Sequence, residues 1–219
     1  MTPRVEAYLA AAGSARDLIA HPRVARAWDR PSALAGFTVG GLAAHLGWMI
    51  VLVADALAGE ASGQPAVSAE DHYRRAPWAD ADIDADINVA IREGGEEAAA
   101  GGHSVFLARL DRALARVRAD LPDADPDRLV ATPVGAWALP LDESLLTRLV
   151  EIAVHSDDLA ASVGLPTPEL PDAAIRPVLG LLVMLAAGRH GQPAVLRALT
   201  RPERAATPIA VFGPTQVGT

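Results

Sequence analysis

The residues in this sequence that could do chemistry are concentrated between Leu141 and Gly164. Their polar members recur every three or four positions: Ser144, Arg148, Glu151, His155, Asp158 and Ser162. On an α-helix this spacing places them on one narrow stripe. The neighbouring residues are mostly apolar, and burying charged groups without partners would be costly, so the stripe must face water or a group that satisfies it. Glu151 and His155 are one turn apart and can chelate a single metal ion.

A third donor comes from a second predicted helix, which begins after Thr38 and runs to about Leu57. His45 is the strongly polar member of its core face. It is either a core histidine bonded to a carbonyl or a third metal ligand. Two imidazoles and one carboxylate suit zinc or another divalent metal, and they leave a coordination position open. In the alternative without a metal, Glu151 pairs with Arg148 and both histidines are hydrogen-bonded core residues.

Composition narrows the possible functions. The chain of 219 residues has no cysteine and its 19 basic residues are all arginine, so neither an internal thiol nor a lysine Schiff base is available. A net charge of −8 disfavours nucleic acid as a partner. The N-terminus does not resemble a signal peptide, and the longest apolar runs, 46–53 and 178–187, are short for a membrane span. We therefore expect a cytoplasmic protein with no membrane partner.

The apolar periodicity predicts a mainly all-α protein. Four amphipathic segments, about 2–20, 38–58, 82–120 and 142–163, are expected to form an antiparallel four-helix bundle with ligands pointing inward. Asp142 is the expected N-cap of the last segment, and Gly164 its end. His103, on the third segment, is either a fourth ligand or a core or rim residue.

The remaining segments are connections and a small appendage. Residues 59–80 form a solvated connection or a lid that carries His72, Tyr73 and Trp78. Short extended pieces are expected at 129–132 and 136–139. Beyond Gly164 we expect a helix from Asp172 to about Gly188, a shorter helix after Pro193, and a terminal strand at 208–212.

Two motifs resemble a known family. WDRPSALAGFTVGGLAAHLG, from Trp28 to Gly47, resembles the entry to the metal-binding domain of mycothiol-dependent maleylpyruvate isomerases. LLTRLVEIAVHSDDLAASVG, from Leu145 to Gly164, resembles the second signature of that family. The resemblance implies a DinB-like bundle over residues 1–165, followed by a shortened C-terminal region of the isomerase type over 166–219.

The resemblance also implies roles for residues. His45, Glu151 and His155 fall on the family's zinc ligands, and Asp158 falls where the family contacts its thiol cofactor. In the C-terminal region, the candidates for function are arginines: Arg197, Arg201 and Arg204.

The chemistry of the residues agrees with the family. A chain without cysteine must use an external thiol such as mycothiol, and a divalent metal lowers the pKa of a bound thiol. Arg148 could orient a carboxylate on a small electrophilic or unsaturated substrate. The predicted protein is an isomerase or a thiol S-transferase, monomeric or homodimeric. The alternative is a non-catalytic binding or regulatory module on the same fold.

Overall fold

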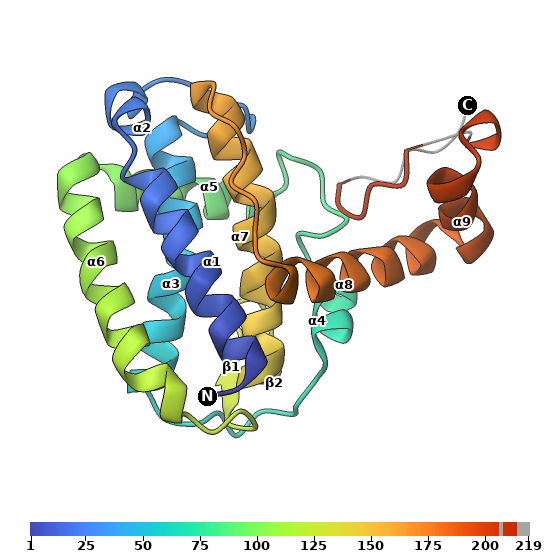
Figure 1. Cartoon of the computed structure of the whole chain (residues 1–219), viewed down its shortest axis with the longest axis horizontal. Coiled ribbons are helices and arrows are strands. Elements are labelled where there is room, and N and C mark those ends of the chain that lie inside the picture. Colours follow the sequence, from blue (N-terminus) through green and yellow to red (C-terminus); the bar gives the residue numbers. More distant parts are fainter. Residues whose placement is uncertain (206–207, 214–219) are drawn as a thin grey trace.

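A bundle of four long helices forms the body of the protein (Figure 1). The computed structural model describes residues 1–205 and 208–213. The bundle helices are α1 (Pro3–Ile19), α3 (Val39–Ala58), α6 (His103–Asp120) and α7 (Leu141–Val163). Helices α1 and α7 run in one direction, and α3 and α6 run in the other. Helix α6 is parallel to α3 because the long connection between them returns the chain to the end of the bundle where α3 began. The all-α, DinB-like architecture predicted from the sequence is confirmed.

Shorter elements surround the bundle. They are α2 (Pro22–Ala27), α4 (Ala69–Arg75), α5 (Asp86–Ala99), α8 (Asp172–His190), α9 (Gln192–Thr200), and the 3-10 turns η1 (Leu121–Asp123) and η2 (Pro202–Arg204). The two extended pieces are present as β1 (Leu129–Ala131) and β2 (Ala138–Pro140). They pair antiparallel, with Val130 opposite Leu139. The second strand of this hairpin, β2, is followed directly by the first turn of α7.

The prediction of one continuous helix over residues 82–120 is wrong. The chain forms α5 and α6 instead, with a break between Ala99 and His103. Gly102 has a φ of 83° and a ψ of 166°, a conformation essentially restricted to glycine, so a continuous helix cannot pass through it. The break lets α6 join the bundle while α5 packs separately against α3.

The predicted start of α7 also needs correction. The helix begins at Leu141 after Pro140, and no side chain caps it. The carboxylate of Asp142 instead accepts a hydrogen bond from Nε of Arg4 at 3.3 Å. The predicted end is confirmed, because Gly164 adopts a left-handed φ of 64°.

Helix α3 starts at a well-defined point, and this matters because it carries His45. The hydroxyl oxygen of Thr38 accepts a hydrogen bond from the amide of Gly41, as expected of an N-cap. Glu96 of α5 accepts hydrogen bonds from both the amide and the hydroxyl of Thr38, at 2.7 and 2.8 Å. Because α5 is part of the long connection between α3 and α6, these bonds attach that connection to the N-terminus of α3.

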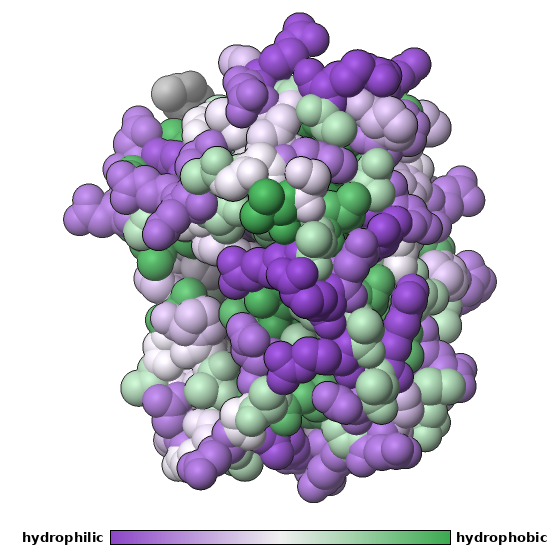
Figure 2. Space-filling model, turned by 90° about the vertical axis from the view of Figure 1, so that its left-hand side faces the viewer, coloured by the Kyte–Doolittle hydropathy of each residue, from purple (hydrophilic) through white to green (hydrophobic). Residues whose placement is uncertain are grey.

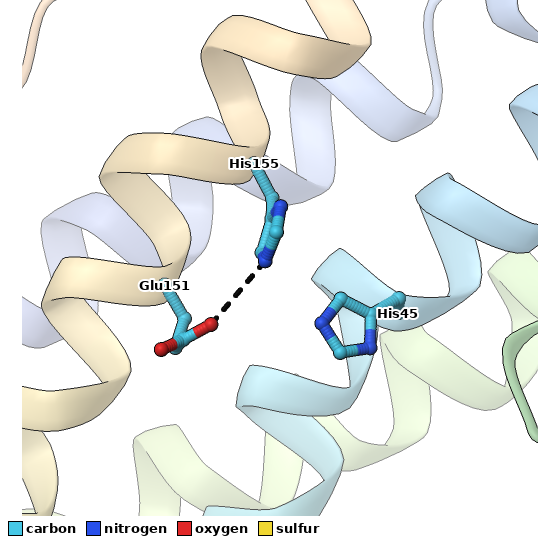
Figure 3. Close-up of side chains that lie close together, drawn as sticks. All are labelled: His45, Glu151 and His155. Atoms are coloured by element: carbon cyan, nitrogen blue, oxygen red, sulfur yellow. Dashed lines mark ion pairs between the residues drawn. The ribbon is translucent and has the colours of Figure 1, made fainter. Parts of the chain in front are cut away.

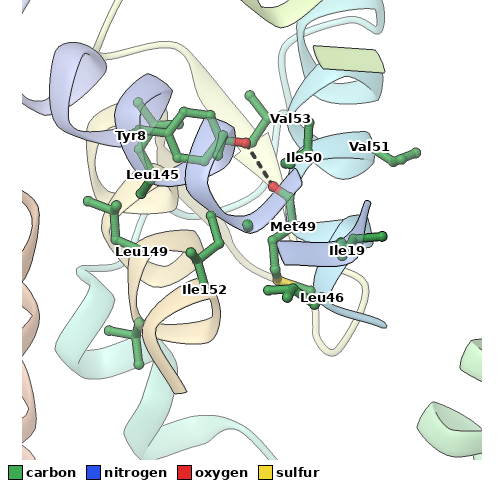
Figure 4. Close-up of a cluster of buried hydrophobic side chains, with 14 of the residues drawn as sticks. Tyr8, Ile19, Leu46, Met49, Ile50, Val51, Val53, Leu145, Leu149 and Ile152 are labelled. Carbon is green, nitrogen blue, oxygen red and sulfur yellow. Dashed lines mark hydrogen bonds between the residues drawn. The ribbon is translucent and has the colours of Figure 1, made fainter. Parts of the chain in front are cut away.

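Part of the core lies between α1, α3 and α7 (Figure 4), and α6 adds to the core with buried residues such as Leu110 and Val117. Leu149 and Ile152 of α7 are fully buried there. Tyr8 of α1 is also fully buried, and its hydroxyl donates to the backbone carbonyl of Met49 at 2.9 Å. This apolar packing fixes α7 against α3 and sets which residues of the two helices face each other.

The C-terminal part leaves the bundle as an arm of α8 and α9 (Figure 1). The predicted terminal strand at 208–212 is not formed. The segment is held instead by a hydrogen bond from the amide of Gly213 to the carbonyl of Ala79 at 2.9 Å, and by contacts of Phe212 with aromatic side chains. Within the described part of the chain, residues 208–212 have no ladder pairing with another segment.

Two helices in the described part of the chain are long and apolar enough to cross a membrane by length and composition. They are α3, with 20 residues, and α8, with 19 residues. The short apolar runs noted in the sequence, 46–53 and 178–187, lie within these two longer helices. The short-run argument from sequence therefore does not exclude a span. Helix α3 is a core helix with 61% of its apolar window buried, whereas the figure for α8 is 28%. On the face over α6, apolar side chains appear only as small patches among polar ones (Figure 2).

Candidate metal centre

Three partly buried side chains from two helices converge between α3 and α7 (Figure 3). Glu151 and His155 project from α7, and His45 projects toward them from α3. One ligand atom from each lies within 4.8 Å of the other two. Nε2 of His155 is 3.3 Å from Oε2 of Glu151, and the rings of His45 and His155 meet edge to face with centroids 4.7 Å apart. The spacing along α7 and the packing of α3 on α7 together produce this arrangement.

His155 lies between two carboxylates. Its Nδ1 is 3.1 Å from Oδ2 of Asp158, one turn further along α7. Burial would lower the pKa of His155, but the hydrogen bonds to Asp158 and Glu151 outweigh it and raise the pKa to about 9. A carboxylate on one ring nitrogen directs the other ring nitrogen toward the centre, which is how metal-binding histidines are commonly oriented.

Glu151 is held from both sides. Its Oε2 faces His155, and its Oε1 accepts a hydrogen bond from the hydroxyl of Tyr73 at 3.0 Å. Burial would raise the pKa of this carboxyl group, but the hydrogen bond and charge of His155 outweigh burial and lower the pKa to about 2. Glu151 is therefore an anion at neutral pH, as a metal ligand must be.

His45 differs from His155 because it has no acidic partner. Its Nδ1 is buried without a hydrogen-bond partner in the described structure. Burial, reinforced by the positive charge of His155, lowers the pKa of His45 to about 4. The ring is therefore neutral at neutral pH and carries a lone pair. In Figure 3 the ring nitrogen that faces Glu151 and His155 is Nε2, and in a neutral ring protonated at Nδ1 this nitrogen carries the lone pair that a cation would use. The donor set of two imidazoles and one carboxylate fits a divalent metal.

Arg148 does not pair with Glu151, so the sequence-based alternative that joined them is wrong. Its Nε and one terminal nitrogen each lie 3.2 Å from the hydroxyl oxygen of Thr147, and the other terminal nitrogen contacts the sulfur of Met49 at 3.7 Å. These are uncharged acceptors. Arg148 also lines a pocket of about 370 Å³ between α3, β1 and α7, together with Ser144 and Leu52.

Other residues singled out in the sequence lie outside the cluster. His103 is at the rim, where its Nε2 is 2.8 Å from the carbonyl of Ile19 and its ring packs edge-on against Trp28. The core-or-rim interpretation of His103 is therefore confirmed. The three C-terminal arginines lie in or just beyond α9, at the far end of the arm from α7 (Figure 1): Arg197, Arg201 and Arg204.

Sequence reasoning missed the role of Tyr73. It identified this residue as part of a connection or lid, whereas Tyr73 lies in α4, is only 3% exposed and contacts Glu151 directly. The apolar pattern around Tyr73 is too short to predict which helix α4 packs against. Only the aromatic content of 72–78 distinguished this segment from an ordinary loop.

The fold and the donor cluster define a DinB-like helical bundle with a candidate metal centre. The chain belongs to the mycothiol maleylpyruvate isomerase N-terminal domain family, whose family model matches residues 8–160. None of the curated proteins compared with the chain matches it.

A solved structure, the crystal structure of the mycothiol-dependent maleylpyruvate isomerase, is similar to this chain with a TM-score of 0.55. The two are 13% identical, and the similarity covers 88% of this chain and 72% of that chain. At this identity the likeness establishes the fold. The family membership predicted from the two sequence motifs is confirmed by the family model.

Proposed function

We propose that the protein is a metal-dependent enzyme that uses mycothiol as an external thiol, as an isomerase of the maleylpyruvate isomerase type or as a thiol S-transferase. The observation that carries the proposal is the convergence of His45, Glu151 and His155 within 4.8 Å in a chain of this family. A divalent metal such as zinc, bound with an open position, lowers the pKa of a thiol so that thiolate is present at neutral pH. The chain contains no cysteine, so the thiol must come from outside.

The residues of the chain have distinct tasks in this proposal. His45, Glu151 and His155 hold the metal. Asp158 accepts a hydrogen bond from Nδ1 of His155, so Nε2 is the nitrogen that gives up its proton and offers a lone pair to the metal. We propose, from the sequence resemblance, that Asp158 also contacts the thiol cofactor; its side chain is 28% exposed.

Arg148 is proposed to bind a carboxylate of the substrate. Its guanidinium hydrogen-bonds to Thr147 and to the sulfur of Met49, and it borders a pocket. In an isomerase, the thiolate adds to the double bond of the substrate, the resulting single bond rotates, and the thiolate leaves. In an S-transferase, the new carbon–sulfur bond remains in the product, and the adjacent carbon takes up a proton. The substrate is accordingly a small electrophilic or unsaturated acid.

Metal content tests the proposal. Purified protein should hold about one divalent metal ion per chain by elemental analysis. His45→Ala, Glu151→Gln and His155→Ala should each remove it. His103→Asn is the matched control, because it changes a histidine that hydrogen-bonds to Ile19 outside the cluster. Wild-type protein that purifies without metal and does not take up zinc would contradict the proposal.

Thiol binding separates an enzyme from a non-catalytic module on the same fold. The ring of Trp48 lies 6.1 Å from that of His45. Mycothiol added to zinc-loaded protein should therefore shift the indole NMR signal of Trp48, which the variant Trp48→Phe identifies. An unchanged signal would favour the binding or regulatory module.

Three further features are proposed from the sequence and the family. The protein acts in the cytoplasm on small molecules, without nucleic acid or membrane partners. It is a monomer or a homodimer. Residues 1–165 form the bundle domain, and 166–219 form a shortened C-terminal region of the isomerase type. Proteolysis between Gly164 and Asp172 followed by size-exclusion chromatography would test the last division.

A further inference from the structure

We propose that Tyr73 is a positioning residue for Glu151, and that the C-terminal segment holds Tyr73 in place through Phe212. This inference rests on the proposed function, because it assumes that Glu151 is a metal ligand. It assigns a role to α4, an element that lies outside the two sequence motifs.

The first argument is the hydrogen bond itself. The hydroxyl of Tyr73 lies 3.0 Å from Oε1 of Glu151 and 3.2 Å from the carbonyl of Thr147. A carboxylate is the stronger acceptor of the two. A tyrosine hydroxyl carries a proton at neutral pH, and a carboxylate oxygen can only accept, so Tyr73 is the donor. Oε1 is thereby occupied, and Oε2 is the oxygen that faces His155.

The second argument is that α4 is fixed to α7 at two points. The hydroxyl oxygen of Ser68 caps α4 by accepting from the amide of Asp71. The next residue, Ala69, donates its amide to Oε2 of Glu143 at 2.6 Å. Glu143 and Glu151 are two turns apart on α7, so a carboxylate of α7 is bonded at each end of the same short helix. The tyrosine hydroxyl is presented by a docked helix, not by a loose loop.

The third argument is the aromatic contact around Tyr73. Its ring lies 5.5 Å from that of Phe212 and 5.7 Å from that of Trp78, and these two rings are 5.3 Å apart. Edge-to-face and tilted pairs at such distances are favourable. Phe212 comes from the segment after α9, and Gly213 bonds to Ala79 beside it. The C-terminal segment thus packs on the residue that orients Glu151.

Tyr73→Phe tests the positioning role. It removes one hydroxyl and keeps the ring, so it should weaken zinc binding about 10- to 100-fold, the usual effect of losing a hydrogen bond that orients a ligand. Affinity is measured by competition with a chelator. The absorption spectrum of the cobalt-substituted protein should change as well, since it reports the ligand geometry.

Tyr8→Phe is the matched control. It also removes a buried tyrosine hydroxyl, but one that donates to the carbonyl of Met49. It should lower the stability of the metal-free protein about as much as Tyr73→Phe does, while zinc affinity stays within about twofold of wild type. A Tyr73→Phe protein that also binds zinc within twofold of wild type would overturn the proposal.

Phe212→Ala tests the link to the C-terminal segment. We expect a smaller loss of zinc affinity, about threefold, in line with couplings through packed side chains. Unchanged affinity would overturn this link. If wild type and all variants fail to bind zinc, the proposed function fails with the inference. If wild type binds, Glu151→Gln does not and Tyr73→Phe binds normally, the inference alone fails.

Discussion

The carboxylate of Asp158 lies one turn beyond His155 on α7, with its Oδ2 3.1 Å from Nδ1 of the imidazole. The next residue toward the N-terminus, Asp157, has a different environment, because it accepts a hydrogen bond from Thr167. Two adjacent acids with different contacts allow the role of one to be measured against the other.

Asp158→Asn should weaken zinc binding about 10-fold, because an amide oxygen is a poorer acceptor for Nδ1–H of His155 than a carboxylate. Isothermal titration or chelator competition measures the affinity. Asp157→Asn should leave it unchanged. Equal effects of the two substitutions would mean that Asp158 acts only through its general negative charge.

Arg148→Met should abolish binding of a small carboxylate to the zinc-loaded protein, while zinc content stays the same. Methionine keeps an unbranched stem but loses the positive charge of the guanidinium, whose hydrogen-bond partners Thr147 and Met49 are uncharged. Maleate is a suitable probe, followed by NMR shifts, and its dimethyl ester is the neutral comparison. Arg16→Met is the control variant, because Arg16 is already paired with Asp111. Maleate binding that survives in Arg148→Met would assign the carboxylate to another group.

His72 should make the protein sensitive to acid. Burial lowers its pKa to about 4, with a further contribution from Arg148 and an opposing one from Glu151. Its Nδ1 accepts a hydrogen bond from the indole of Trp137 at 3.1 Å, which is possible only while that nitrogen is unprotonated. The unfolded chain takes up the proton near pH 6.5, so the stability from neutral His72 is present above pH 6.5 and declines as the pH falls toward 4.

Denaturant unfolding of the metal-free protein between pH 7.5 and pH 4 measures this effect. In His72→Gln the free energy of unfolding should depend less steeply on pH in that range, by up to about 1.4 kcal/mol per pH unit, the value for one proton. His45 remains in both proteins, so its own titration cancels in the comparison. Parallel profiles would show that His72 is protonated as easily when folded as when unfolded.

Two glycines should respond to alanine with opposite signs. Gly102 separates α5 from α6 at a φ of 83°, and no atom lies within 4 Å of a Cβ placed there, so the cost of Gly102→Ala is conformational, about 1–3 kcal/mol. Gly180 also has open space around its Cβ position but lies inside α8, so Gly180→Ala should stabilise by about 1 kcal/mol. Thermal unfolding of both variants measures the difference. Stabilisation by Gly102→Ala would mean that α5 and α6 can join into one helix.

The sequence predicted the bundle well because the signals that define its helices come from residues close together in the sequence. The apolar period, the N-cap at Thr38 and the left-handed Gly164 are properties of neighbouring residues, and the structure confirms them. The errors came where local signals compete. Asp142 has the right chemistry for a cap, but the chain arriving through β2 starts α7 at Leu141, and Arg4 takes the carboxylate.

The stripe on α7 was determined by sequence alone, because 3.6 residues per turn fix which side chains share a helix face. That Glu151 and His155 lie together, with Asp158 next in line, needed no tertiary information. The meeting of His45 with this pair, and the placement of Tyr73 on Glu151, were decided by the tertiary structure. Tyr73 is 78 positions from Glu151 in the sequence, and His45, Tyr73 and Glu151 lie on three different helices. Their approach depends on the packing of apolar surfaces from several helices. No local spacing encodes that distance.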